Sequence, residues 1–121
     1  MILAAQRVID PPSSQTLPLG ENATFTCRTI GRVRWEIRNP TTGFVAAELP
    51  LRDDQLSVLA AMGIYATDTL INSSTTEYSS TLILTTDERN ETEVYCRATL
   101  NLAIIDLGQP ATVILFGGCA V

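Results

Sequence analysis

The chain of 121 residues has the length of one domain and carries a formal net charge of −5, with no histidine and no lysine. These absences exclude catalysis by a histidine base or a Schiff-base lysine, so we expect a protein that is not an enzyme and has no cofactor. An acidic chain whose eight cations are all arginine is also a poor partner for nucleic acids and for anionic membrane surfaces.

Runs in which every second residue is apolar predict short β-strands, because side chains alternate between the two faces of a strand. Glycine, proline and asparagine between these runs mark turns. In chain order, strands are expected at residues 1–10, 15–19, 23–29, 33–38, 44–49, 68–71, 80–85, 93–101 and 111–116. About eight or nine short strands separated by turns indicate an all-β sandwich or barrel.

Some stretches give a weaker pattern. Pro11 and Pro12 break the first strand, because proline cannot donate to a ladder. Residues 56–62 fit either a strand or a short helical turn, since periodicity cannot separate the two over so short a run. Residues 104–110 are expected to form a loop, because they contain Gly108 and Pro110.

Two cysteines and the single tryptophan all fall on the apolar phase of their strands. This phase points them into one core together with other apolar residues. The expected core contains Phe25, Cys27, Trp35, Leu82, Leu84 and Cys96. Three cysteines in a chain of this size also favour an oxidising compartment.

The spacing of Cys27, Trp35 and Cys96 resembles that of the immunoglobulin superfamily, as do Leu82 and Leu84 in the strand E position. The resemblance covers nearly the whole chain. It implies a Greek-key β-sandwich of two sheets, with an intersheet disulfide between Cys27 and Cys96. The long interval between these cysteines leaves room for C′ and C″ strands, which favours a variable-type (V-set) domain or an I-set-like relative from an animal cell-surface or secreted receptor.

The resemblance implies one domain over residues 1–118, with residues 119–121 as a tail or the start of a stalk. The family usually has a tyrosine two residues before its second cysteine, but Val94 stands there. We therefore expect no tyrosine corner, and Tyr95 to point outward. Cys119 is left over: it either forms an intermolecular disulfide or belongs to a stalk or a following domain. A zinc site would need thiolates that the Cys27–Cys96 bond consumes.

Three glycosylation sequons begin at Asn22, Asn72 and Asn90. In a variable-type sandwich all three lie away from the sheet that contains strands C, C′, F and G. Glycans are bulky and solvated, so this sheet is expected to be the free face. Its outward residues would be Arg34, Glu36, Arg38, Phe44, Tyr95, Arg97 and Thr99.

Tyrosine and arginine are residue types that protein interfaces favour. The sequence therefore predicts an extracellular recognition or adhesion domain that binds another protein or a second copy of itself, in an immune or an adhesive role. One alternative is lectin-like binding of an anionic glycan, with Arg97 holding a carboxylate. Another is a spacer domain whose charged face is only solvated. Residues 56–66 are about half as long as a membrane span, so any anchor is expected outside this chain.

Overall fold

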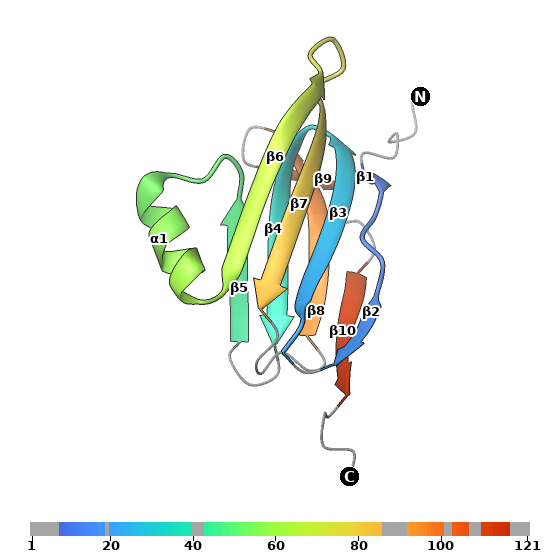
Figure 1. Cartoon of the computed structure of the whole chain (residues 1–121). Coiled ribbons are helices and arrows are strands. Elements are labelled where there is room, and N and C mark those ends of the chain that lie inside the picture. Colours follow the sequence, from blue (N-terminus) through green and yellow to red (C-terminus); the bar gives the residue numbers. More distant parts are fainter. Residues whose placement is uncertain are drawn as a thin grey trace.

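The computed structural model describes residues 8–18, 20–39, 43–85, 92–100, 103–106 and 110–116, and it is an immunoglobulin-like sandwich of two β-sheets (Figure 1). One sheet has the order β1-β3-β7-β6, with β1 (Val8–Asp10), β3 (Asn22–Ile30), β7 (Glu77–Thr85) and β6 (Ile64–Asn72). The other has the order β2-β10-β8-β4-β5, with β2 (Gln15–Pro18), β10 (Pro110–Phe116), β8 (Thr92–Leu100), β4 (Arg32–Asn39) and β5 (Gly43–Glu48). The predicted two-sheet fold class is confirmed.

The first two predicted strands belong to different sheets. β1 pairs with β3, whereas β2 pairs with β10 in the only parallel pairing between described strands. Pro11 and Pro12 lie between β1 and β2. Because proline has no N–H to donate, the ladder of β1 cannot continue through them, and the chain crosses from one sheet to the other at this point.

A disulfide between Cys27 on β3 and Cys96 on β8 joins the two sheets, as the resemblance implies. The alternation of β3 is fully regular, with every second residue from Ala23 to Thr29 buried. Phe25, Trp35, Leu82 and Leu84 are all buried in the same core. The core therefore lies between the sheets, where the apolar phases of their strands meet.

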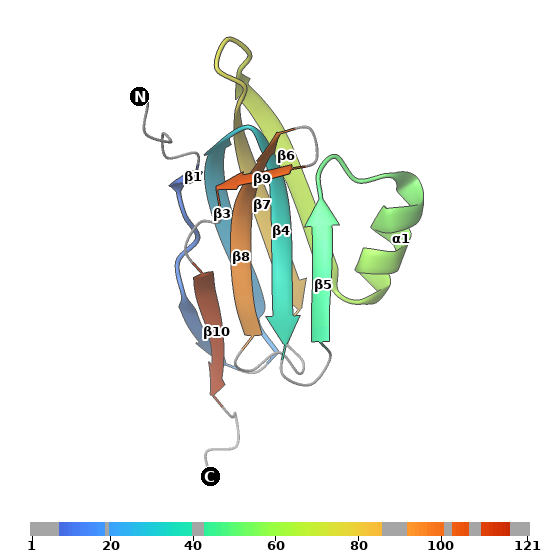
Figure 2. The ribbon, with the colours of Figure 1, turned by 180° about the vertical axis from the view of Figure 1, so that it is seen from behind.

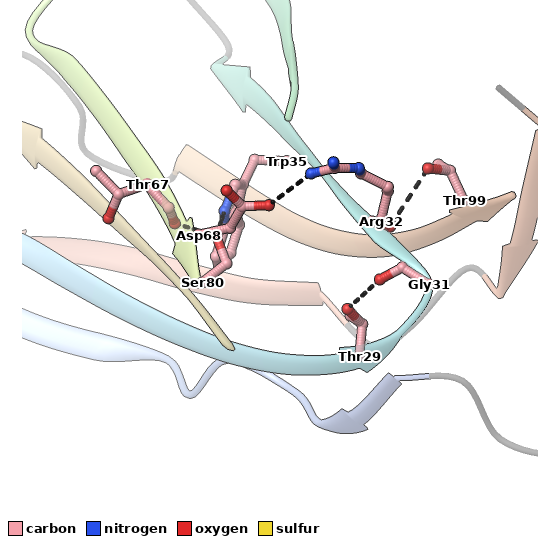
Figure 3. A network of polar contacts seen from close by, with 8 residues as sticks. All are labelled: Thr29, Gly31, Arg32, Trp35, Thr67, Asp68, Ser80 and Thr99. Carbon is pink, nitrogen blue, oxygen red and sulfur yellow. Dashed lines mark hydrogen bonds and ion pairs between the residues drawn. The ribbon is translucent and has the colours of Figure 1, made fainter. Parts of the chain in front are cut away.

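Trp35 also makes a polar link across the sandwich. Its indole N–H donates to the Ser80 hydroxyl on β7 at 2.8 Å, and that hydroxyl donates to the carbonyl of Thr67 on β6 at 2.7 Å (Figure 3). A buried indole without an acceptor would be destabilising, so Ser80 satisfies the one polar group of the largest core side chain. The same figure shows Arg32 beside Asp68, with 3.3 Å between the guanidinium and the carboxylate.

Of residues 56–62, which fit either a strand or a helical turn, residues 56–61 belong to helix α1 (Asp53–Ala61) and Met62 is its C-cap. Gln55 accepts the N–H of Arg52 at 3.0 Å, and Asp53 and Asp54 place negative charge in the first turn. Residues 49–63 contain this helix and no strand, so the expected C″ strand is absent there. Figure 1 shows α1 beside the edge of the sandwich that β5 and β6 form.

The prediction of a loop at residues 104–110 is wrong for residues 104–106. β9 (Ala103–Asp106) is a strand that pairs antiparallel with the end of β8, where Leu100 faces Ala103 and Thr99 faces Ile104. Four residues are too few for alternation to reveal a strand, and it is the pairing with β8 that defines this one.

Candidate recognition face

The outer surface of β5, β4 and β8 brings together most of the residues that the sequence assigns to the free face. β4 lies between β5 and β8, and Figure 2 looks onto this sheet. The register places Arg34 opposite Glu48 on one side and Arg97 on the other, and Arg38 opposite Phe44. We call this surface the recognition face and define it by Arg34, Glu36, Arg38, Phe44, Ala46, Glu48, Glu93, Tyr95 and Arg97.

Glu36 is the buried centre of the recognition face. One carboxylate oxygen accepts a hydrogen bond from Arg97 Nε at 2.5 Å, and the other accepts one from Arg34 Nε at 2.8 Å. Arg34 also approaches Glu48, with 3.7 Å between Nη1 and Oε1. Glu36 is only 5% exposed, so the two arginines cover it as well as neutralise it.

The charge of Glu36 is retained despite its burial. Burial raises the pKa of the Glu36 carboxyl, but hydrogen bonds from Arg97 and Arg34, together with their charges, lower it more. The net pKa lies below the ordinary value for glutamate. Glu36 is therefore ionised near neutral pH and holds two arginines from two strands in fixed positions.

Acid should remove the stabilisation that ionised Glu36 provides. Since its folded-state pKa lies below the unfolded-state value of about 4.3, the contribution is complete above about pH 5 and is lost as the pH falls through the folded-state pKa. We expect the free energy of unfolding of the wild type to fall more steeply below about pH 4.3 than that of Glu36→Gln. Urea unfolding of both proteins from about pH 6 to about pH 3 measures this, and parallel curves would contradict it.

Aromatic rings extend the contacts from β8 to β5. The guanidinium of Arg97 lies 4.7 Å from the centre of the Tyr95 ring, and that of Arg38 lies 5.6 Å from it. Arg38 is also 5.8 Å from the centre of the Phe44 ring. Such cation–π contacts are worth about 0.5–1 kcal/mol at exposed sites. Tyr95 points outward, as expected, and both Arg38 and Arg97 contact its ring.

The residues of the recognition face differ in what they offer to a partner. Phe44 is 51% exposed, and Arg38 is exposed and forms no ion pair with any described residue. Arg97 is mostly covered and engaged by Glu36. Arg38 and Phe44 are therefore available to a partner, while Arg34, Glu36 and Arg97 form a fixed ionic cluster beside them, linked to Arg38 through the Tyr95 ring.

Two expectations about this face need correction. Thr99 is not exposed: it is buried, and its hydroxyl donates to the carbonyl of Arg32 at 3.3 Å (Figure 3). The register of β8 with β4 is unbroken as far as Thr99, so the alternation of β8 is retained, and β9 pairs with β8 at this residue. Glu36 does lie on this face, but it is buried under its arginines rather than exposed.

Glu48 is the residue that the sequence analysis missed. It shares the phase of Phe44 on β5, four positions later, and its carboxylate approaches Arg34. The alternation of residues 44–49 carried this signal, because residues 44, 46 and 48 must share one face of a regular strand.

Two of the three sequons lie on the four-stranded sheet. Asn22 is exposed at the start of β3, and Asn72 is exposed at the end of β6, where its Oδ1 accepts the N–H of Ser74 at 2.9 Å. Both belong to the sheet opposite the recognition face. Asn90 and Cys119 lie outside the described residues, as does the boundary expected after residue 118.

Among the described residues, no group of acidic or cysteine side chains is arranged to hold a metal ion. In the same part of the chain, no helix has the length and apolar character needed to cross a membrane. A scan against protein-family models finds no family that matches the chain, and no curated protein matches it.

Proposed function

We propose that this protein is an extracellular recognition domain of the immunoglobulin superfamily, of the variable type, and that it binds a protein partner through the recognition face. The strand order supports the variable type, because β5 extends the sheet in the C′ position and β2 pairs parallel with the last strand. The disulfide suits an oxidising, extracellular environment.

The observation that carries the proposal is the exposed pair of Arg38 and Phe44 beside a fixed ionic cluster of Arg34, Glu36 and Arg97. Arginine and aromatic side chains dominate binding energy at interfaces when they are held in place before binding. Glu36 fixes Arg34 and Arg97 by binding both, and Arg97 and Arg38 contact the same Tyr95 ring, which links Arg38 to the fixed cluster. A merely solvated face would not need a buried carboxylate beneath its cations.

Binding of an anionic glycan receives less support. That alternative depends on Arg97, whose side chain is 12% exposed and bound to Glu36. A sugar carboxylate would have to displace the carboxylate that already holds this guanidinium. The outward cations and acids of the face are also equal in number, with Arg34, Arg38 and Arg97 against Glu36, Glu48 and Glu93, so the face is not a cationic site.

Matched double substitutions on the two sheets test the proposal. We expect Arg38→Ala with Phe44→Ala to reduce binding at least about tenfold, because interface anchors contribute about 2 kcal/mol or more each. The control is Arg28→Ala with Tyr65→Ala, which removes an arginine and a half-exposed ring from the opposite sheet. The probe is the glycosylated domain, multimerised on fluorescent beads and applied to beads carrying the same domain and to cells of the source organism.

Bead aggregation would identify the partner as a second copy, and cell staining alone would identify it as another protein. In either case the signal should fall with the first double variant and persist with the control. Equal loss in both variants, or no binding to either target, would overturn the proposal.

A further inference from the structure

The outer edge of β5 carries unused backbone hydrogen-bonding groups. Among the described strands, β5 is the last of its sheet, and its only neighbour is β4. The N–H of Leu49 donates to the carbonyl of Val33 at 3.0 Å, which fixes the alternation of the ladder. The backbone groups of Val45 and Ala47 therefore face β4, and those of Phe44, Ala46 and Glu48 face away from it.

Nothing in the described part of the chain pairs with this edge. The hydrogen bonds between described residues leave the outward amide and carbonyl groups of Phe44, Ala46 and Glu48 without a partner. Within β5 itself, Gly43–Glu48 contains no proline or lysine and its register with β4 is unbroken, so in the described part of the chain it is helix α1, beside this edge, that limits what can pair there. The edge is therefore open to one more strand.

An apolar groove runs along the same edge. It has a volume of about 310 Å³ and is lined on one side by Phe44, Val45 and Ala46. Because consecutive residues of a strand point to opposite faces, a groove lined by three in a row lies along the edge rather than over either face. Its other side consists of Leu51 and of residues on α1, among them Val58 and Met62, which are 60% and 39% exposed.

From these two features we infer that the groove between β5 and α1 binds an extended peptide segment of another protein, which adds a strand to the edge of β5. Main-chain hydrogen bonds to Phe44, Ala46 and Glu48 would hold the segment, and alternate apolar side chains would enter the groove beside Val58 and Met62. The volume of about 310 Å³ lies within the range of about 300–1,000 Å³ for ligand pockets, but the outward backbone groups of β5 beside the groove favour an extended peptide.

The position of α1 selects a single strand over a second copy of the sheet. Both views show α1 beside β5, on the side from which an additional sheet would approach (Figures 1 and 2). One strand needs only about 5 Å beside β5, whereas a sheet that continued past it would meet the helix. This site does not depend on the proposed function, although Phe44 contributes to both.

Hydrogen exchange measured by NMR tests the inference residue by residue. The probe is an acetylated and amidated heptapeptide in which valine and threonine alternate, added at about 1 mM, where even a weak ladder is populated. We expect the exchange of the amide protons of Phe44, Ala46 and Glu48 to slow about tenfold or more, while those of Val45 and Ala47 stay slow throughout. A control peptide N-methylated at every second residue removes the ladder donors and should have no effect.

Variants separate binding at the edge from binding elsewhere. Ala46→Pro removes an outward N–H without interrupting the ladder with β4, and it should abolish the protection, whereas Ala46→Ser keeps the N–H and should retain it. Val58→Glu changes only the helical side of the groove and should weaken binding at least about tenfold.

Absence of protection at the three amides, or protection that Ala46→Pro and Val58→Glu both leave intact, would overturn the inference. So would protection that appears without peptide as the protein concentration rises, because the edge would then belong to a second copy.

Discussion

Replacing Cys27 and Cys96 together by alanine should lower the free energy of unfolding by about 4 kcal/mol. The disulfide closes a loop with a sequence separation of 69, and cross-linking so long a loop removes much of the entropy of the unfolded chain. Domains of this size have only about 5–15 kcal/mol of stability in total. The substitution should therefore leave a domain that is marginally folded or unfolded at physiological temperature.

Urea unfolding with and without reductant measures this effect. Reductant should destabilise the wild type by a similar amount and leave the double alanine variant unchanged, which separates loss of the bond from loss of cysteine packing. Val94 stands where the family usually has its corner tyrosine and is buried, so no tyrosine at that position compensates for the missing bond. A reduced protein as stable as the oxidised one would contradict this account.

Arg97→Ala should cost about 3 kcal/mol of stability, far more than a surface arginine usually does. Removing one partner of a buried ion pair costs about 3–5 kcal/mol, because the remaining charge is left buried without compensation. Arg34 still binds the other oxygen of Glu36, which places the effect at the lower end of that range. The substitution also uncovers one side of the Tyr95 ring.

Arg38→Ala is the matched control, because it removes an arginine from the same face that makes contacts with rings and no ion pair among the described residues. Its cost should stay within about 1 kcal/mol. Adding Glu36→Gln to Arg97→Ala should recover about 1 kcal/mol or more, since a neutral amide needs no countercharge. An equal loss of stability in Arg97→Ala and Arg38→Ala would show that the buried charge of Glu36 does not need Arg97 as its partner.

The different losses of stability expected for Arg97→Ala and Arg38→Ala decide which of these residues can be substituted to study binding. A loss of binding in Arg97→Ala would combine a missing contact with a disturbed support for the whole face. Arg38 and Phe44 are exposed and make no contact with Glu36, so their removal reports on contact with a partner.

Strand periodicity predicts much of this structure. Regular alternation placed Cys27, Trp35 and Cys96 on inward positions, and the same phase placed Arg34, Arg38, Tyr95 and Arg97 on the outer surface of one sheet. Such inferences succeed because a half-buried strand allows only one assignment of its two faces. Two-residue periodicity contains no information about neighbouring strands, however, so it could not show that Arg97 faces Arg34 across β4 and β8 and that both cover Glu36.

The features that periodicity missed depend on contacts between distant segments. Thr99 is buried because β9 pairs with the end of β8. The sequence of helix α1 shows no clear helical pattern of apolar residues, since Leu59 is its only buried residue. The hydrogen bond from the Arg52 N–H to the Gln55 side chain is the one further local sign of the helix start. The groove beside β5 exists only because that helix takes the place of a further strand, and no short sequence pattern encodes such a substitution.

The most direct measurement of the central claim is binding after a glycan is added to each sheet in turn. Phe44→Asn with Ala46→Thr creates a sequon on the recognition face, and Ser79→Asn creates one on the opposite sheet before Thr81. A glycan blocks a surface by its bulk. With glycosylation confirmed by mass, the first protein should lose binding to beads and cells, and the second should bind as the wild type does. Binding that survives a glycan on the recognition face, or that is lost only with the glycan at residue 79, would contradict the account.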